Sequence, residues 1–201
     1  MKKWIFWGLL VVAGTMWYFS NGKPTIKNAG RPVQLIAAFG DSLTAGQGAA
    51  KMQAYPAVLE KLSGVQVVNL GRSGETAVQA RERLGDVLVL QPQLVLIEFG
   101  ANDFMQSRSR EAAVAAVAHM VETVQAAGAM AVIVDTGGPG MEGYTNAYKK
   151  LAREKHALFV PGIMKGIFNK RSLKSDMIHP NAAGYELIAQ RIYKTIKPYL
   201  K

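Results

Sequence analysis

The stretch VQLIAAFGDSLTAGQG, residues 33–48, indicates the fold of this 201-residue chain. Its first seven residues form a short apolar run between Pro32 and Gly40, which is typical of a strand buried on both faces of a parallel sheet. Ser42 follows the carboxyl end of this strand, at the edge where open α/β sheets bind their ligands. Its hydroxyl is therefore a candidate nucleophile, although Gly, Asp and Ser after a strand most often form only a turn.

Four further apolar runs follow and alternate with helical patterns, and short loops with glycine or proline separate them. This alternation predicts a single α/β domain in which a five-stranded parallel sheet lies between helical layers, with right-handed crossovers. The expected strands cover residues 33–39, 65–69, 94–99, 130–135 and 158–161, and the expected helices cover 56–62, 76–84, 110–127, 144–155 and 182–196.

The first twenty residues carry two lysines and then an uncharged run from Trp4 to Phe19. A helix of this length spans about 24 Å, slightly less than the ~30 Å of a bilayer core, and aromatic residues lie at both of its ends. We interpret residues 1–20 as an N-terminal hydrophobic helix that acts as a signal anchor. A cleaved signal peptide is the alternative, disfavoured because the bulky Tyr18 lies two places before a cleavage point after Ser20.

Residues 21–32 are polar and contain glycine and proline, so we expect a tether that leads into a domain over residues 33–201. The very short tail before the apolar run favours export of this domain. The protein is then anchored in a membrane and faces the periplasm or the cell exterior, or it is secreted if the segment is cleaved. The chain has no cysteine, which excludes disulfides, thiol catalysis and cysteine-ligated metals.

The net charge of +10 is concentrated near the carboxyl end, where residues 149–201 hold twelve basic and three acidic side chains. No recognised nucleic-acid-binding motif accompanies them, so we expect no nucleic-acid partner. Two interpretations are equally good. The cations contact anionic lipid head groups beside the membrane segment, or they form a solvated face that aids solubility.

Polar residues in four separate segments can form one site around the first strand. Gly74 lies in NLGRSGET, Asn102 in FGAND, and Asp176 and His179 in DMIHPN just before the last helix. A Ser, a His and an acid on convergent loops are the groups that acyl transfer needs. An Asn amide and glycine N–H groups can bind the oxyanion. Each of these residues alone is ordinary, and only their occurrence together with Ser42 indicates a site.

The four blocks, in this order, resemble those of the SGNH (GDSL) hydrolase family from about residue 34 to 195, and most of all its bacterial arylesterase, acyl-CoA thioesterase and lysophospholipase branch. The resemblance implies a flavodoxin-like three-layer α/β/α fold with strand order 2-1-3-4-5. It also implies hydrolysis of carboxylic esters or thioesters without a metal or cofactor.

By the same resemblance, Ser42 is the nucleophile, His179 the base and Asp176 the residue that orients the imidazole. The Ser42 N–H, the Gly74 N–H and the Asn102 amide would form the oxyanion hole. The stretch DTGGPGMEGYTNAY, residues 135–148, departs from the family's usual appearance in a region that helps to shape the acyl pocket.

Other polar residues are expected to serve the structure. We expect Asp41 and Asp103 to brace loops and Glu98, in an apolar strand, to be a buried hydrogen-bonded brace. His119 and His156 have no partner pattern, and we expect both to be structural.

Three side chains, Leu43, Phe104 and Met105, line a hydrophobic groove or belong to the core.

The leading function is a serine esterase or thioesterase that acts on a small-molecule or lipid ester. Deacetylation of a polysaccharide is the alternative within the same chemistry. A nucleotide-binding module is disfavoured because the loop after the first strand lacks GxxxxGK[ST] and a complete GxGxxG. A membrane-anchored binding domain without catalysis is the remaining alternative.

Overall fold

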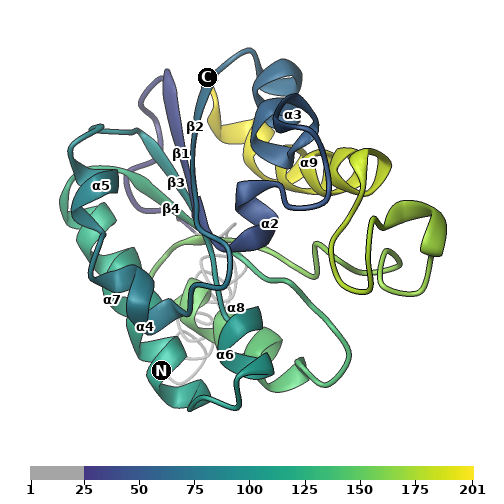
Figure 1. Ribbon diagram of the computed structural model, residues 1–201. Coiled ribbons are helices and arrows are strands. Elements are labelled where there is room, and N and C mark those ends of the chain that lie inside the picture. Colours follow the sequence, from purple (N-terminus) through teal and green to yellow (C-terminus); the bar gives the residue numbers. More distant parts are fainter. Residues whose placement is uncertain (1–24) are drawn as a thin grey trace, which may run out of the picture.

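The structure is a computed structural model and describes residues 25–201, so the helix expected over residues 1–20 lies outside the described residues. Five parallel strands form one sheet in the order β2-β1-β3-β4-β5, which confirms the expected fold class and strand order (Figure 1). The strands are β1 (Leu35–Gly40), β2 (Gln66–Gly71), β3 (Leu94–Glu98), β4 (Met130–Val134) and β5 (Leu158–Val160).

Helices cover both faces of the sheet and complete three layers. Helices α3 and α9 pack on one face, and α4, α5, α7 and α8 pack on the other (Figure 1). The short helices α2 and α6 follow β1 and β3 directly. The helices are α2 (Ser42–Ala45), α3 (Tyr55–Ser63), α4 (Ala77–Arg81), α5 (Gly85–Leu88), α6 (Ala101–Met105), α7 (Arg110–Ala126), α8 (Glu142–Glu154) and α9 (Ala182–Ile196), with 3₁₀ turns at Lys51–Gln53, Arg171–Leu173 and Lys197–Tyr199.

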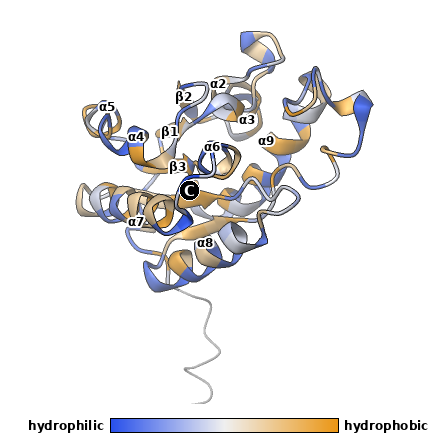
Figure 2. Ribbon diagram, turned by 60° about the horizontal axis from the view of Figure 1, so that its bottom comes forward, coloured by the Kyte–Doolittle hydropathy of each residue, from blue (hydrophilic) through white to orange (hydrophobic). Residues whose placement is uncertain are grey.

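The continuous apolar runs in the strands are explained by burial on two sides. In β1, Ala37 and Phe39 pack toward α4 and α7, whereas Ile36 and Ala38 pack toward α3 and α9. Complete burial of a side chain such as Ile or Phe contributes about 1.5–3 kcal/mol, so both helical layers stabilise each central strand. The strands at the centre of the molecule are accordingly coloured mostly as hydrophobic in Figure 2.

The expected helix over residues 76–84 is wrong in its extent, because the chain forms two short helices, α4 and α5, joined by a turn at residues 82–84. The turn carries the Arg83 side chain inward. Its guanidinium lies 4.4 Å from the centre of the Phe39 ring, and its Nε donates to Glu75 Oε1 over 2.8 Å. Both partners of this ion pair are nearly buried, and the pair fixes the turn between α4 and α5 to the segment before α4.

Residues 25–32, the described part of the expected tether, lie against the domain. Ile26 is buried in the core, the Lys27 N–H donates to the His156 carbonyl, and Asn28 Nδ2 donates to the Gln125 and Ala129 carbonyls. These partners lie at the amino-terminal ends of β4 and β5. The chain therefore enters the domain at the edge of the sheet opposite the carboxyl ends of the strands. Within residues 25–201, no helix has both the length and the apolar character needed to cross a bilayer.

Candidate active site

Ser42 is the first residue of α2, directly beyond the end of β1. Asp41 caps this helix, because its Oδ1 accepts the Leu43 N–H over 3.0 Å. The tight turn requires glycine at position 40, where a Cβ atom would lie 2.0 Å from Thr44 Oγ1 and 2.8 Å from the Glu98 carbonyl oxygen. The sequence Gly-Asp-Ser-Leu thus bends the chain from a buried strand into a single helical turn with Ser42 at its start.

His179 lies on the loop before α9, as the sequence indicates. An Asp176 carboxylate oxygen, Oδ1, accepts the N–H groups of Ile178 and His179 over 2.8 and 2.7 Å and shapes this loop into a turn. A second contact joins α9, which follows this loop, to the segment after α2, because the Tyr185 hydroxyl donates to the Gln47 carbonyl over 2.7 Å.

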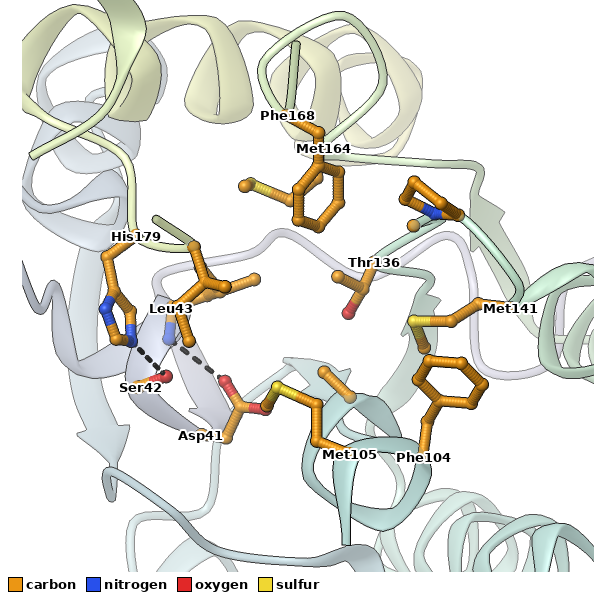
Figure 3. A pocket seen from close by; sticks show the side chains of 14 residues that line it. Asp41, Ser42, Leu43, Phe104, Met105, Thr136, Met141, Met164, Phe168 and His179 are labelled. Carbon is orange, nitrogen blue, oxygen red and sulfur yellow. Dashed lines mark hydrogen bonds between the residues drawn. The ribbon is translucent and has the colours of Figure 1, made fainter. Parts of the chain in front are cut away.

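The structure brings Ser42, His179 and Asp176 into one hydrogen-bonded series. His179 Nε2 lies 3.1 Å from Ser42 Oγ, and His179 Nδ1 lies 2.7 Å from Asp176 Oδ2 (Figure 3). The hydrogen bonds from the His179 backbone and ring and from the Ile178 N–H lower the pKa of Asp176 to about 2. Asp176 is therefore a carboxylate at neutral pH, and Nδ1 must carry the proton that it accepts. The free lone pair of Nε2 then faces the serine hydroxyl.

Groups that can donate to a negative oxygen lie on three segments that hydrogen bonds join near Ser42. The Ser42 and Gly74 N–H groups donate to no acceptor within residues 25–201, and Gly74 adopts a φ of 80° that favours glycine. Asn102, in the first turn of α6 rather than on a loop, donates from Nδ2 to Asp41 Oδ2 over 3.0 Å and to the Glu75 carbonyl over 3.1 Å. All three groups expected from the sequence thus come from segments that meet around Ser42.

Two buried carboxyl groups lie behind these donors. Asp41 and Glu98 are 1% and 0% exposed, and burial raises the pKa of Asp41 to about 6 and raises the pKa of Glu98 well above its usual range. The Thr44 and Thr136 hydroxyls donate to Glu98 over 3.0 and 3.2 Å. Glu98 is therefore the buried hydrogen-bonded brace that the sequence indicates. Asp103 is a brace as well, because its Oδ2 accepts the Ala77 N–H over 2.9 Å.

A cavity of about 200 Å³ opens beside Ser42 and His179. Its walls are almost entirely apolar (Figure 3). Leu43, Phe104 and Met105 all line it, which confirms the groove interpretation for Phe104 and Met105, whereas Leu43 lines the cavity and also belongs to the buried core. The stretch 135–148 contributes Thr136, Gly138, Pro139 and Met141, and the remaining apolar walls are Ala101, Met164, Phe168 and Ile178.

The residues that sequence reasoning missed come mainly from the loop after β5. Met164 and Phe168 lie there and face the cavity (Figure 3). No motif marks them, because an apolar residue in a loop gives the same pattern whether it lines a cavity or anchors the loop to the core. Within the described residues, no three His, Asp or Glu side chains are grouped as metal ligands would be.

The sequence profile of the GDSL-like lipase/acylhydrolase family matches residues 38–187, most of the part that forms the sheet and the site. The chain belongs to this family, and it is an ester-bond hydrolase of the GDSL esterase and thioesterase type.

Three comparisons agree with this placement. The chain is 31% identical over 169 residues to the Escherichia coli "Thioesterase 1/protease 1/lysophospholipase L1", covering 79% of this chain and 81% of that protein. It resembles the crystal structure of TesA with a TM-score of 0.77 at 27% identity, covering 83% of this chain and 100% of that one. It also resembles the psychrotrophic esterase EstA from Pseudoalteromonas sp., inhibited by monoethylphosphonate, with a TM-score of 0.75 at 27% identity, covering 83% of this chain and 98% of that one.

Proposed function

We propose that this protein hydrolyses carboxylic esters or thioesters with an apolar acyl group through a Ser42–His179–Asp176 triad and an acyl-enzyme. The observation that carries the proposal is the continuous hydrogen-bonded series from Ser42 Oγ through His179 to Asp176 at the edge of an apolar cavity. A hydroxyl, an imidazole with a fixed tautomer and a carboxylate are the three groups that acyl transfer requires.

In the acylation step, Ser42 Oγ attacks the acyl carbon while its proton moves to His179 Nε2, and the carbonyl oxygen becomes an oxyanion. Collapse of this intermediate breaks the bond to the alcohol or thiol, which leaves with the proton from His179. Water then attacks the acyl-Ser42 ester, and His179 takes the water proton and returns it to Ser42 Oγ. The products are the free carboxylic acid and the original enzyme.

The Ser42 and Gly74 N–H groups are available to the oxyanion without rearrangement. Asn102 already gives both of its N–H bonds, one to the Asp41 carboxylate and one to the Glu75 carbonyl. To donate to the oxyanion, the Asn102 amide must therefore give up or share one of these two hydrogen bonds. We assign the exchange to the Glu75 carbonyl, because a carboxylate holds a hydrogen bond more strongly than a neutral carbonyl does.

The cavity favours an acyl chain over an acetyl group as the acid part of the substrate. A space of about 200 Å³ with apolar walls gains free energy from each buried methylene, at about 0.8 kcal/mol. An acetyl group would leave most of these walls without contact. The cavity is smaller than the ~300–1,000 Å³ typical of sites for drug-sized ligands, so we expect short and medium acyl chains to fit best. These features favour an acyl esterase over a polysaccharide O-acetyl esterase.

A panel of nitrophenyl esters from acetyl to dodecanoyl, together with acetylated glycans, tests this preference. We expect kcat/KM to rise with chain length up to a medium chain and then to fall. Ala101→Leu adds three carbons at a cavity wall on α6. It should lower the ratio of kcat/KM for the preferred ester to kcat/KM for the acetyl ester at least about tenfold. Each methylene of the substrate that loses its place in such a pocket lowers kcat/KM ~10-fold or more.

Ala115→Leu is the matched control, since it makes the same change on the exposed side of α7 and should leave the chain-length profile unchanged. An acetyl-only profile of the unaltered protein, with good turnover of acetylated glycans, would contradict the acyl preference.

We also propose that residues 1–20 anchor the protein in a membrane with the domain on the exported side. The support is the uncharged run from Trp4 to Phe19 with its aromatic ends. The chain enters the domain at the edge of the sheet opposite Ser42, through residues 25–28. An anchored domain would thus open its active site toward the aqueous compartment rather than toward its own bilayer.

A further inference from the structure

Two carboxyl groups without a cationic partner lie side by side beneath the proposed oxyanion donors. Glu98 ends β3 and is paired in the sheet with Gly40, the residue before Asp41. Both carboxyl groups are buried, and within residues 25–201 neither forms an ion pair with a lysine or arginine. Two neighbouring carboxylates cannot both be ionised in a buried site, so the pair must hold a proton.

The hydrogen-bond partners show which residue carries the proton. Both oxygens of Asp41 accept from nitrogen donors, Leu43 N–H and Asn102 Nδ2, which can only donate. A proton on Asp41 would face one of these N–H groups. Glu98 instead meets only the Thr44 and Thr136 hydroxyls, which can rotate to suit either form. The proton therefore belongs on Glu98, and from there it can be donated to the neighbouring Asp41 carboxylate.

We propose that Glu98 is a positioning residue whose protonated carboxyl donates to the Asp41 carboxylate and thereby holds the Asn102 amide in place beside Ser42. The proposal rests on the function proposed above, in which Asn102 helps to bind the oxyanion. Glu98 itself touches no substrate, because it is fully buried and does not line the cavity.

The proton on Glu98 matters for two reasons. It keeps Asp41 ionised and oriented, so that the Asp41 oxygens remain acceptors for Asn102 and for the start of α2. It also keeps a second negative charge away from the place where the oxyanion forms. An ionised Glu98 would repel both Asp41 and the oxyanion at short range in a site with little water.

The test compares Glu98→Gln with Glu98→Leu in the full chain, with kcat and KM measured on a soluble nitrophenyl ester. Glutamine keeps an N–H donor for Asp41 and an acceptor for the threonines, so kcat should stay within about threefold of the unaltered protein. Leucine removes the donor, so kcat should fall about 10- to 100-fold with little change in KM. That loss is below the ~10²–10³-fold cost of removing a complete oxyanion donor.

A double-mutant cycle with Asn102→Ala asks whether Glu98 acts through Asn102. If it does, Glu98→Leu should have little further effect on kcat once the amide is gone. Gln125→Leu is the control for general damage, because it removes a buried amide that donates to the Lys155 carbonyl far from Ser42. It should lower the melting temperature and leave kcat unchanged. If Glu98→Leu does not fold, Asp41→Asn takes its place in the cycle, since it removes the carboxylate to which Glu98 would donate.

The proposal is overturned if Glu98→Gln loses as much kcat as Glu98→Leu, or if the effects of Glu98→Leu and Asn102→Ala on kcat multiply in the double variant. Failure of the function proposed above is a separate result, because it would appear as turnover that persists without Ser42.

Discussion

Replacement of Ser42 by alanine is expected to lower kcat for ester hydrolysis by about 10⁵- to 10⁶-fold, close to the background rate. Ser42 Oγ lies 3.1 Å from His179 Nε2, and no other hydroxyl makes a hydrogen bond to this nitrogen within the described residues. The loss follows because the acyl-enzyme cannot form without the Oγ atom. The measurement is steady-state release of nitrophenol from the purified full chain.

The fold should survive this change. Within residues 25–201, the Ser42 side chain forms a hydrogen bond with His179 alone and packs into neither of the two apolar core clusters. Ser172→Ala removes another hydroxyl, exposed on the 3₁₀ turn Arg171–Leu173, and should retain full turnover. Turnover of Ser42→Ala within about tenfold of the unaltered protein would refute the nucleophile assignment.

Replacement of His179 by alanine is expected to cause a loss of the same order, about 10⁵- to 10⁶-fold, since the serine then has no base. Asp176 cannot replace the imidazole, because its carboxylate contacts the His179 ring and makes no hydrogen bond with Ser42. The same ester assay measures the effect, with circular dichroism to confirm that the variant folds.

The matched control is His119→Ala, on the exposed side of α7, which should keep kcat and KM unchanged. A variant that retained more than a tenth of the original kcat would remove His179 from the mechanism.

The sheet could be predicted because burial on both faces leaves a plain signal. The strand predictions agree with β1 to β5 within one or two residues at each end, since short apolar runs between glycine and proline have few other interpretations. The helix over residues 182–196 agrees with α9 at both ends. Its Asn181 side chain caps the first turn, and Pro198 follows its last residue.

The short helices could not be predicted because tertiary contacts decide them. Helix α2 has four residues and depends on the Asp41 cap and on Gly46 in a left-handed conformation. Helix α6 begins at a glycine with a φ of 115° directly after β3. Neither segment is long enough to show a helical repeat of apolar residues. The turn between α4 and α5 carries Arg83, whose ion pair with Glu75 links residues eight positions apart.

The site was predictable where residue chemistry is distinctive, and less so where only shape matters. Ser42, His179 and Asp176 lie together as the sequence indicates, and Asn102 bonds to Asp41, the residue before Ser42, and to Glu75, the residue after Gly74. Their catalytic roles remain predictions. The occupied hydrogen bonds of Asn102 and the proton shared by two buried carboxyl groups depend on distances between strands that no local pattern contains.

The central claim is that Ser42 is the nucleophile that His179 activates. Covalent labelling of the full chain with a fluorophosphonate, followed by mass spectrometry of its peptides, tests this claim most directly. The account predicts one phosphonyl adduct, on the peptide that contains Ser42, with labelling absent in Ser42→Ala and strongly slowed in His179→Ala. An active protein that carries no adduct, or that carries it on another residue, would contradict the account.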